Sequence, residues 1–430
     1  MIWLILSIVV GFLLSLIVLI NEKKSLLSIV SVVNIIFFMG YVLRPLLIIY
    51  YFDGYTYKGN DIIYDPTNAF MTILIANYFY VFFVFGAVLT NSKFETDYIV
   101  LSEKSAIRVS VILMVLGSIS YLYYLQSAGV LKWGFTSLFA YIYDARGHYY
   151  FRAFSFLFIF GLFGYLYLKK TNMFFKISLI IFAILISVSF YARQHLIIFI
   201  ILGFHLYSVF NFKGNRLLYT FRKSIASVVV LLLVIYSMIY MLEMRTSLSD
   251  GNEIGTIQIE NSEVQLFDYV LNSGQLTFLD FGIAAMHNKS YVENIAGHSL
   301  MNLLFLPVPA SLFPSKPENF NRVLAKDIPG PHPSPAFGFN IEIYFNFPYI
   351  FLFIGPIAMY FTGKGFRRSF LSMDKSYFFF MVYVFVYSSF FMFIRSGLFS
   401  SVGVFIERIL PFLLVVILHN LIFLRKRRTS

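Results

Sequence analysis

The sequence predicts an all-α, polytopic membrane protein with about eleven transmembrane helices and one long water-exposed loop. Of its 430 residues, 59% are hydrophobic and only 13% are charged, whereas an ordinary globular domain is about 25% charged. The mean hydropathy is +0.78, and long apolar runs alternate with short clusters of Lys and Arg. Lipid is therefore the expected solvent for most of the chain.

Each apolar run of about 20 residues is long enough to cross a bilayer as a helix. The first run lacks the basic start and the small-residue cleavage site of a signal peptide, so we expect a span there too. The two runs on either side of Arg193 are short and are expected to form a tight hairpin. The predicted spans cover residues 2–20, 27–50, 68–90, 107–125, 153–168, 177–192, 195–210, 224–243, 347–362, 376–394 and 400–424.

The basic loops set the orientation of these spans. Most of the 33 Lys and Arg residues fall on one face if the spans alternate, and such a bias marks the cytoplasmic side. The amino terminus is then outside and the carboxy terminus inside. The loops that carry this bias are 23–24, 169–176, 213–223, 364–375 and 425–428.

The opposite face carries the longest polar segment, which divides the chain into three parts. Residues 1–243 form an amino-terminal set of transmembrane helices, residues 244–346 a long loop, and residues 347–430 a carboxy-terminal set. Eight of the 13 prolines fall between Pro307 and Pro335, which excludes a continuous helix there. The apolar stretch 301–313 is too short to cross and is expected to lie at the membrane interface.

Composition and motifs exclude several classes of function. The chain has no cysteine, so disulfides, thiolate metal sites and cysteine nucleophiles are excluded. Its net charge of +12 comes largely from the clusters that flank the spans, so nucleic acid is not an expected partner. The sequence has no P-loop, HExxH motif, nucleophile elbow or Asp-x-Asp pair, and its seven histidines show no metal-ligand spacing. We therefore expect no metal ion and no cofactor.

Four arginines interrupt or cap apolar segments, namely Arg44, Arg193, Arg395 and Arg408. An arginine at mid-helix costs roughly 2.5–3.5 kcal/mol, and within the spans Glu407 is almost the only carboxylate that could offset one. A planar guanidinium binds phosphate oxygens through two N–H groups, so the missing partner is expected to be a lipid phosphate or pyrophosphate. The alternatives are snorkelling of Arg193 and Arg395 to lipid headgroups and structural pairing of Arg44 or Arg408 with neighbouring carbonyls.

A second candidate site is a short polar loop before the fifth predicted span. It contains Tyr141, Tyr143, Asp144, Arg146, His148 and Tyr149. Tyrosines stack on sugar rings and hydrogen-bond to hydroxyl groups, and the charged residues could orient them. The alternative is an aromatic belt at the membrane surface, where tyrosine is enriched in any case.

The long loop carries the third set of candidates. Lys316 adds a cation, and His332 and Glu342 are possible proton carriers within or after the proline-rich stretch. The alternative for each is an ordinary solvated side chain. Glu342 directly precedes a predicted span, so we expect it at the mouth of the arginine cluster.

Three short stretches resemble the Wzy-type polymerases of O-antigen and related repeat-unit polysaccharides. They are Tyr191-Ala-Arg-Gln-His195, the proline-rich stretch 307–317 with the later Glu342-Ile-Tyr-Phe-Asn-Phe347, and Phe393-Ile-Arg-Ser-Gly397. The resemblance covers most of the chain in topology but only these stretches in residues. The chain departs from the long-loop arginine and glycine spacings of some members, which leaves the sugar-binding residues open.

The resemblance implies a GT-C-like architecture and metal-independent glycosyl transfer at the periplasmic face of the bacterial inner membrane. The growing glycan would leave undecaprenyl pyrophosphate and join a new lipid-linked repeat unit, with a flippase and a chain-length regulator as partners. Its general base would be Glu342, with Asp144 and His332 as the next candidates. Pyrophosphate would be bound by Arg193, Arg395 and Arg408, then by Lys316, Arg146 and Arg44, and sugar by Tyr141, Tyr143 and Tyr149.

Two other functions fit the same features. An O-antigen ligase shares the topology and the lipid-linked donor but passes the glycan to lipid A core. A lipid-linked oligosaccharide flippase would use embedded cations to line a translocation path, although transport does not need a long outer loop.

Overall fold

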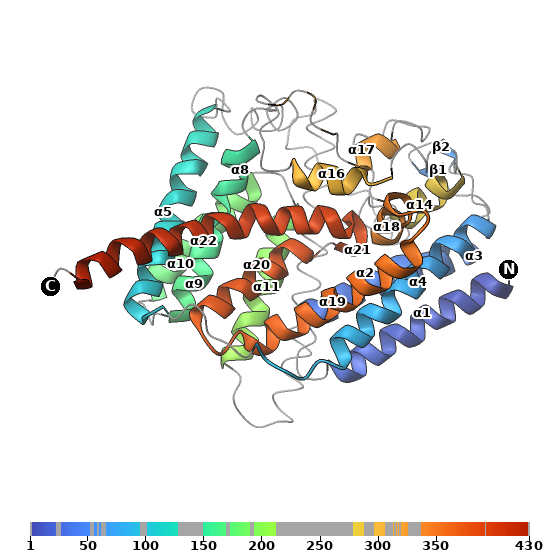
Figure 1. Ribbon diagram of the computed structural model, residues 1–430, viewed down its shortest axis with the longest axis horizontal. Coiled ribbons are helices and arrows are strands. Elements are labelled where there is room, and N and C mark those ends of the chain that lie inside the picture. The colour runs from blue at the N-terminus through green and yellow to red at the C-terminus, as the bar shows by residue number, and fades with distance from the viewer. Residues whose placement is uncertain are drawn as a thin grey trace, which may run out of the picture. The chain divides into compact units, whose positions relative to one another are not determined.

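A computed structural model describes most of the chain as helices (Figure 1). The chain divides into two compact units. The first comprises residues 1–93, 261–371 and 389–405, and the second comprises residues 94–260, 372–388 and 406–430. The described residues are 2–22, 27–51, 56–57, 60–61, 66–94, 101–127, 149–168, 173–189, 193–211, 278–287, 296–305, 313, 315, 317, 320–325, 337–391 and 393–428.

Five helical segments in the described ranges are long and apolar enough to cross a membrane. They are Ile2–Asn21, Ile29–Ile49, Pro66–Val88, Glu103–Ser127 and Leu398–Ile422, and each coincides with a span expected from sequence. Shorter apolar helices at Ala153–Leu168, Phe174–Ser187 and Tyr377–Phe390 overlap three further expected spans. The expected span 224–243 lies outside the described residues. The predicted class, an all-α membrane protein, is confirmed, and the number eleven stays a prediction.

The first unit is built mainly from helices around α4 (Pro66–Val88). Its other elements are α1 (Ile2–Asn21), α2 (Ile29–Phe38), the π-helix η1 (Met39–Leu43), α3 (Arg44–Tyr51), the two-residue strands β1 (Thr56–Tyr57) and β2 (Asn60–Asp61), α14 (Phe278–His287), α16 (His298–Leu304), α17 (Phe320–Ala325), α18 (Phe339–Asn346), α19 (Phe351–Ser372), α21 (Phe393–Ser396) and the start of α22 (Leu398–Arg428). The strands pair antiparallel, with Thr56 opposite Asp61.

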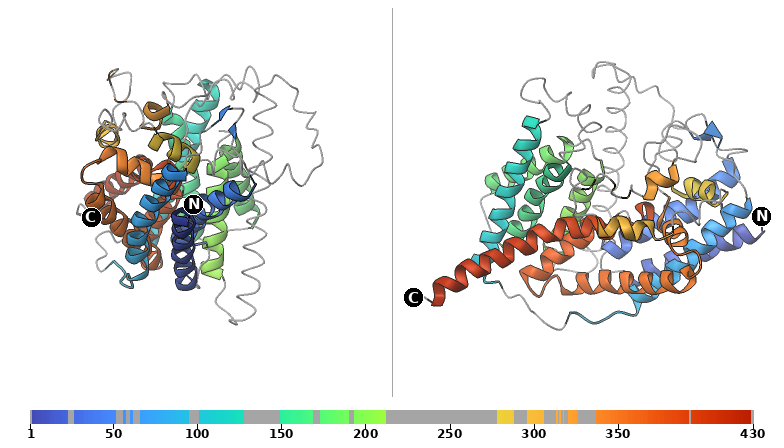
Figure 2. Two further views of the ribbon diagram at one scale, coloured as in Figure 1. Left: turned by 90° about the vertical axis from the view of Figure 1, so that its right-hand side faces the viewer. Right: turned by 45° about the horizontal axis from the view of Figure 1, so that its top comes forward.

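Glycine allows α4 and α19 to pack closely, and the two helices lie side by side in Figure 1 and Figure 2. A methyl group on Gly86 would overlap the carbonyl of Tyr360, and one on Gly363 would overlap the carbonyl of Phe83. Small residues permit such approach between helices in lipid, where packing replaces the hydrophobic effect between helices as the driving force. The rings of Phe37 and Tyr80 stack nearby at 3.7 Å between centroids.

The second unit follows the same packing rule. Its described helices are α5 (Glu103–Ser127), α8 (Tyr149–Ser155), α9 (Leu157–Leu168), α10 (Met173–Ser189), α11 (Arg193–Asn211), most of α20 (Tyr377–Phe390) and the remainder of α22. Gly117 of α5 meets the backbone of Phe158, and Gly161 of α9 meets the carbonyl of Ser110. Close backbone contact again replaces large apolar side chains at the helix interface.

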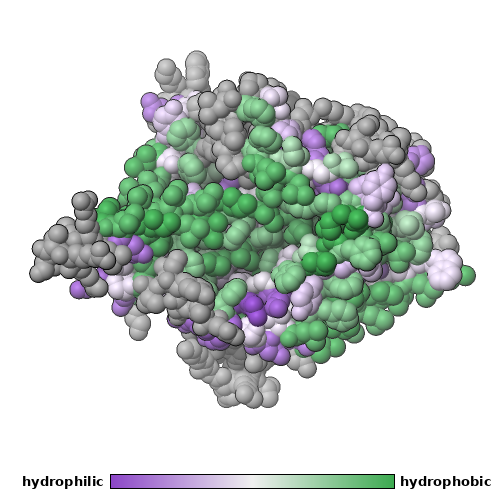
Figure 3. Space-filling model, in the orientation of Figure 1, coloured by the Kyte–Doolittle hydropathy of each residue, from purple (hydrophilic) through white to green (hydrophobic). Residues whose placement is uncertain are grey.

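Large apolar side chains cover the surfaces of the long helices. On α1, Trp3 is 70% exposed and Ile20 is 51% exposed, although both are hydrophobic. In Figure 3 hydrophobic residues dominate the visible face. A surface of this kind is stable against lipid and not against water, in agreement with the membrane-spanning lengths of the helices.

The prediction that residues 244–346 form a water-exposed loop needs correction for two of its helices. In α14 and α18 nearly every side chain is buried inside the first unit, including Phe278, Leu279, Ile341 and Phe345. Their short apolar runs suit burial against other helices, and their length of about 12–15 Å is too small to cross a bilayer. The long segment therefore contributes to the core. Within its proline-rich part the structure describes the six-residue helix α17.

Candidate active site

Helix α18 carries three polar side chains, and all three are buried. Asn340, Glu342 and Asn346 are 0%, 2% and 3% exposed. The helix begins at Gly338, which has a positive φ of 81° and whose N–H donates to the carbonyl of Arg395 at 2.9 Å. Buried polar groups cost free energy unless they are hydrogen-bonded, so each of the three side chains needs a partner from another element.

The carboxylate of Glu342 lies at the amino-terminal end of α22. Its Oε2 accepts a hydrogen bond from the N–H of Phe399 at 3.0 Å, and its Oε1 accepts from the hydroxyls of Ser299 at 3.3 Å and Ser400 at 3.4 Å. The first N–H groups of a helix have no partner within the helix and carry a partial positive charge. Glu342 thus supplies the missing acceptor for α22.

Gly397 makes this approach possible. Its φ is +98°, a conformation that favours glycine, and a Cβ there would overlap the carboxylate of Glu342. The glycine in the Arg395-Ser-Gly397 turn therefore both ends α21 and leaves room for the acid.

Burial raises the pKa of Glu342 to about 7, although backbone N–H groups of Phe399 and Ser400 and the hydroxyl of Ser299 act to lower it. Helix α18 lies outside the candidate membrane spans. A carboxyl group with a pKa near neutrality exists in both protonation states at physiological pH. It can accept a proton from a substrate and return it later.

Asn346 holds Ser299, one of the two serine partners of Glu342, in place. Its Oδ1 accepts from the N–H of Ser299 at 2.7 Å, and its Nδ2 donates to the Ser299 hydroxyl at 2.9 Å and to the Glu342 carbonyl at 2.7 Å. The carbonyl of Asn346 also accepts from the N–H of Gly297 at 3.0 Å. These bonds fix α16, and with it the Ser299 hydroxyl, against α18.

Asn340 connects the other end of α18 to the amino-terminal helices. Its Oδ1 accepts from the hydroxyl of Tyr41, and its Nδ2 donates to the carbonyl of Thr72 at 2.9 Å. Tyr41 belongs to η1, and π-helical turns of this kind are frequent at functional sites. The polar cluster thus extends from η1 through α18 to the start of α22.

The structure gives Arg44 a different partner from the one predicted from the sequence. We expected its partner to be a lipid phosphate, but the guanidinium is 2% exposed and pairs with Asp280 of α14. Its Nε donates to the two carboxylate oxygens at 3.1 Å and 3.0 Å, and its Nη2 also donates to Oδ2. Asp280 neutralises the buried charge without a ligand. The expectation that Arg44 lacks a carboxylate partner is therefore wrong, and its contacts agree with the structural alternative considered for this residue.

Arg395 lies in the same region as Glu342. It belongs to α21, its side chain is half-buried, and its carbonyl holds the start of α18 through Gly338. Two residues later, Gly397 contacts the carboxylate of Glu342. The backbone of the α21 turn that contains Arg395 thus lies close to the start of α18 and to the Glu342 carboxylate, and the role of Arg395 in pyrophosphate binding stays a prediction.

Arg408 belongs to the second unit. Its Nη1 donates to the carbonyl of Ser388 at 2.6 Å, and its guanidinium lies 5.7 Å from the ring centre of Phe160. It lines a small apolar cavity with Phe156, Ile159, Phe163, Ile198, Phe199 and Leu202. The pairing with a neighbouring carbonyl is the structural alternative considered for this residue, and its role in pyrophosphate binding stays a prediction.

The remaining predicted site residues fall outside the described part of the chain. This applies to Tyr141, Tyr143, Asp144, Arg146, Lys316 and His332, and to the side chains of Tyr149 and Arg193, whose backbones begin α8 and α11. Among the described residues no group of three His, Asp or Glu side chains could hold a metal ion.

Several residues of the cluster were missed by the sequence interpretation, above all Asp280, Asn340, Asn346 and Ser299. A signal for three of them was present. Asp280 is a single acid in the apolar run Phe278–Met286, and Asn340 and Asn346 flank Glu342 in an otherwise apolar octapeptide. Polar residues at such positions are expensive in lipid and usually have a partner. Ser299 gave no such signal, because a serine at a helix start is ordinary.

The residues of the polar cluster are identified from their burial and hydrogen bonds in this structure. Comparisons with protein-family models, curated proteins and solved structures gave no match.

Proposed function

We propose that this protein polymerises undecaprenyl-pyrophosphate-linked oligosaccharide repeat units by metal-independent glycosyl transfer at the periplasmic face of a bacterial inner membrane. The observation that carries the proposal is the buried carboxylate of Glu342, whose pKa is raised to about 7 and which lies against the turn that follows Arg395. The proposal includes a GT-C-like arrangement of about eleven spans. A flippase that delivers the repeat units and a chain-length regulator are its proposed partners.

In the proposed reaction, a hydroxyl oxygen of the acceptor repeat unit attacks the anomeric carbon of the donor glycan. A new glycosidic C–O bond forms, the bond to the pyrophosphate oxygen breaks, and undecaprenyl pyrophosphate leaves with that electron pair. Glu342 accepts the hydroxyl proton, because a general base works best with a pKa near the operating pH. Arg395 stabilises the negative charge that develops on the leaving pyrophosphate.

The surroundings of Glu342 support this division of roles. Its hydrogen-bond donors in the described part of the chain are hydroxyls and backbone N–H groups, so the donors that hold the carboxyl group are neutral and it can gain or lose a proton near neutral pH. The amino-terminal end of α22 adds a partial positive charge, which favours an anionic ligand near Arg395. Neither residue requires a nucleotide or a divalent ion.

The first test uses the purified protein in proteoliposomes with a lipid-linked repeat unit as substrate. Glu342→Gln keeps the shape and one hydrogen-bond acceptor but cannot take a proton. We expect it to lower the rate of polymerisation by about 10²–10⁴-fold. Glu103→Gln, at the exposed start of α5, is the matched control and should keep the rate of the unmodified protein. Unchanged turnover in Glu342→Gln would rule out the base role.

The second test addresses pyrophosphate binding in cells. Arg395→Ala and Arg193→Ala should each abolish the polysaccharide ladder while lipopolysaccharide capped with a single repeat persists. Arg108→Ala, an exposed arginine of α5, is the control and should leave the ladder intact. Normal ladders in both variants would contradict the site assignment. A deletion strain that makes no capped product at all would favour the ligase or flippase instead.

A further inference from the structure

Helices α4 and α19 each carry an exposed apolar stripe that ends in basic residues. On α19 the stripe consists of Phe353, Ile357, Phe361, Lys364 and Arg368, whose spacings of four, four, three and four residues keep them on one helix face. Phe353, Ile357 and Phe361 are 72%, 58% and 61% exposed. The side chains change from apolar to cationic within one turn of the helix.

A similar order is found at the end of α4. Phe85 of α4 and Leu89, just beyond the end of the helix at Val88, are 49% and 69% exposed, and the exposed Lys93 lies four residues further along the chain. A leucine so exposed beside a lysine is unusual for a surface that faces water alone. It suits the boundary between lipid chains and lipid headgroups.

Contacts between the two helices place both basic ends together. Tyr78 donates to the carbonyl of Leu352, and Gly86, further along α4, meets the backbone of Tyr360 and Lys364, so the two helices run in the same direction. Further along, Nη2 of Arg368 donates to the hydroxyl of Ser92 at 3.1 Å. Lys93 is the next residue, and it therefore lies at the same end as Lys364 and Arg368. We call these three cations and the flanking apolar residues the α4–α19 ridge.

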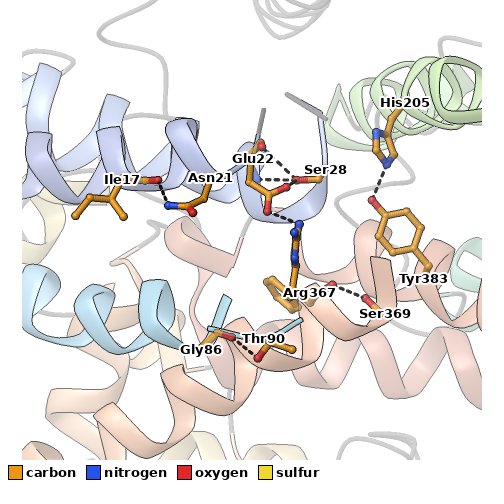
Figure 4. Close-up of polar contacts among 12 residues, drawn as sticks. Ile17, Asn21, Glu22, Ser28, Gly86, Thr90, His205, Arg367, Ser369 and Tyr383 are labelled. Carbon is orange, nitrogen blue, oxygen red and sulfur yellow. Dashed lines mark hydrogen bonds and ion pairs between the residues drawn. The ribbon is translucent and has the colours of Figure 1, made fainter. Parts of the chain in front are cut away.

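The neighbouring Arg367 pairs with an acid from another element. Arg367 donates from Nη1 to Oε1 of Glu22 at 2.6 Å, and Ser28 donates to Oε2 at 2.9 Å (Figure 4). Glu22 thus balances the charge of Arg367. Lys93, Lys364 and Arg368 are three further cations at this end of the two helices.

We propose that the α4–α19 ridge is a binding site for an anionic phospholipid. The acyl chains would lie along the exposed side chains of Phe85, Leu89 and Phe361, and the negatively charged headgroup would contact Lys93, Lys364 and Arg368. Cations near a membrane surface attract anionic lipids, and the apolar stripes supply the contact that a soluble anion could not use. The site lies apart from Glu342 in function and does not depend on the proposed glycosyl transfer.

The full-length protein in nanodiscs of mixed neutral phosphatidylcholine and anionic phosphatidylglycerol provides the test. After release from the nanodisc, native mass spectrometry measures which lipids remain bound. We expect the unmodified protein to retain phosphatidylglycerol in preference to phosphatidylcholine. The double variant Lys364→Gln/Arg368→Gln should lower this preference roughly tenfold, because each cation near the surface contributes a few-fold to anionic-lipid binding.

Two matched variants make the result specific. Lys104→Gln/Arg108→Gln removes the same residue types at the same spacing from the exposed start of α5, and it should keep the preference. Lys364→Arg/Arg368→Lys keeps both charges and should also keep it. Equal loss in the α5 control, loss in the charge-conserving variant, or no preference in the unmodified protein would each overturn the proposal.

Discussion

Two buried acids in the first unit are satisfied in opposite ways. Asp280, on α14, pairs with the guanidinium of Arg44, and both side chains are almost fully enclosed. Glu342, on α18, is equally enclosed but lies against the start of α22 and two serine hydroxyls. The α14 region therefore holds an acid with a full opposite charge, and the α18 region holds an acid with neutral donors.

This difference affects the pKa of each acid. Burial raises the pKa of Asp280, while the charge of Arg44 and its hydrogen bond act to lower it. Neutral donors and a helix end offset only part of the cost of burying the charge, so the pKa of Glu342 rises to about 7. The carboxyl group of Glu342 can therefore exchange a proton near neutral pH.

Breaking the ion pair is expected to have the largest effect on stability. Either Arg44→Ala or Asp280→Ala leaves one buried charge without its partner, which typically costs about 3–5 kcal/mol. Denaturant titration of the purified protein in mixed micelles measures this loss as a change in the free energy of unfolding.

Removing both charges provides the control for this prediction. Arg44→Met/Asp280→Leu fills a similar volume with apolar groups, and buried ion pairs replaced in this way often lose little stability. The double variant should therefore be much more stable than either single variant. Losses that simply add would show that the two residues do not act as a pair.

Much of the fold followed from the sequence because spans are recognised locally. Runs of about 20 apolar residues predicted the five long helices, and each boundary depends only on neighbouring residues. Helix α14 was missed because its ten residues are too short for this rule and its burial depends on α4 and η1, which lie far away in sequence.

The candidate site was predictable only in part. Glu342 and Arg395 were identified because a charge next to an apolar run is costly in lipid unless it has a partner or a function. The partner of Arg44 could not be found in this way, since Asp280 is 236 residues distant and lies in the segment assigned to the loop. Hydrogen bonds from Ser299 and Ser400 likewise depend on how three separate helices meet.

The second prediction concerns how the free energy of unfolding depends on pH because of Glu342, the acid held by neutral donors. The folded protein holds the proton of Glu342 up to a pKa of about 7, whereas the unfolded chain releases it near the ordinary value of 4.5. The folded state thus binds more protons between these values, so stability falls as the pH rises through this window, by about 3 kcal/mol in total. Glu342→Gln removes this dependence and should gain stability relative to the unmodified protein as the pH rises.

Unfolding titrations at several pH values in the same micelles measure this relative change. Glu103→Gln removes an exposed carboxyl from α5 and should follow the curve of the unmodified protein. Parallel curves for Glu342→Gln and the unmodified protein would mean that Glu342 binds its proton no more tightly in the folded state, and the contrast with Asp280 would then disappear.

The smallest expected effect concerns Gly397, whose backbone conformation leaves room for the Glu342 carboxylate at the start of α22. Gly397→Ala places a methyl group against the carboxylate and strains a residue with a φ of +98°, which should cost about 1–3 kcal/mol and weaken the bond from Phe399. Gly365→Ala is the matched control, because a Cβ there meets nothing within 4 Å and alanine favours the helix by about 0.5–1 kcal/mol. Unfolding titrations should therefore shift in opposite directions for the two variants. Equal shifts would show that the acid does not depend on this glycine, and that the start of α22 can hold Glu342 in more than one backbone geometry.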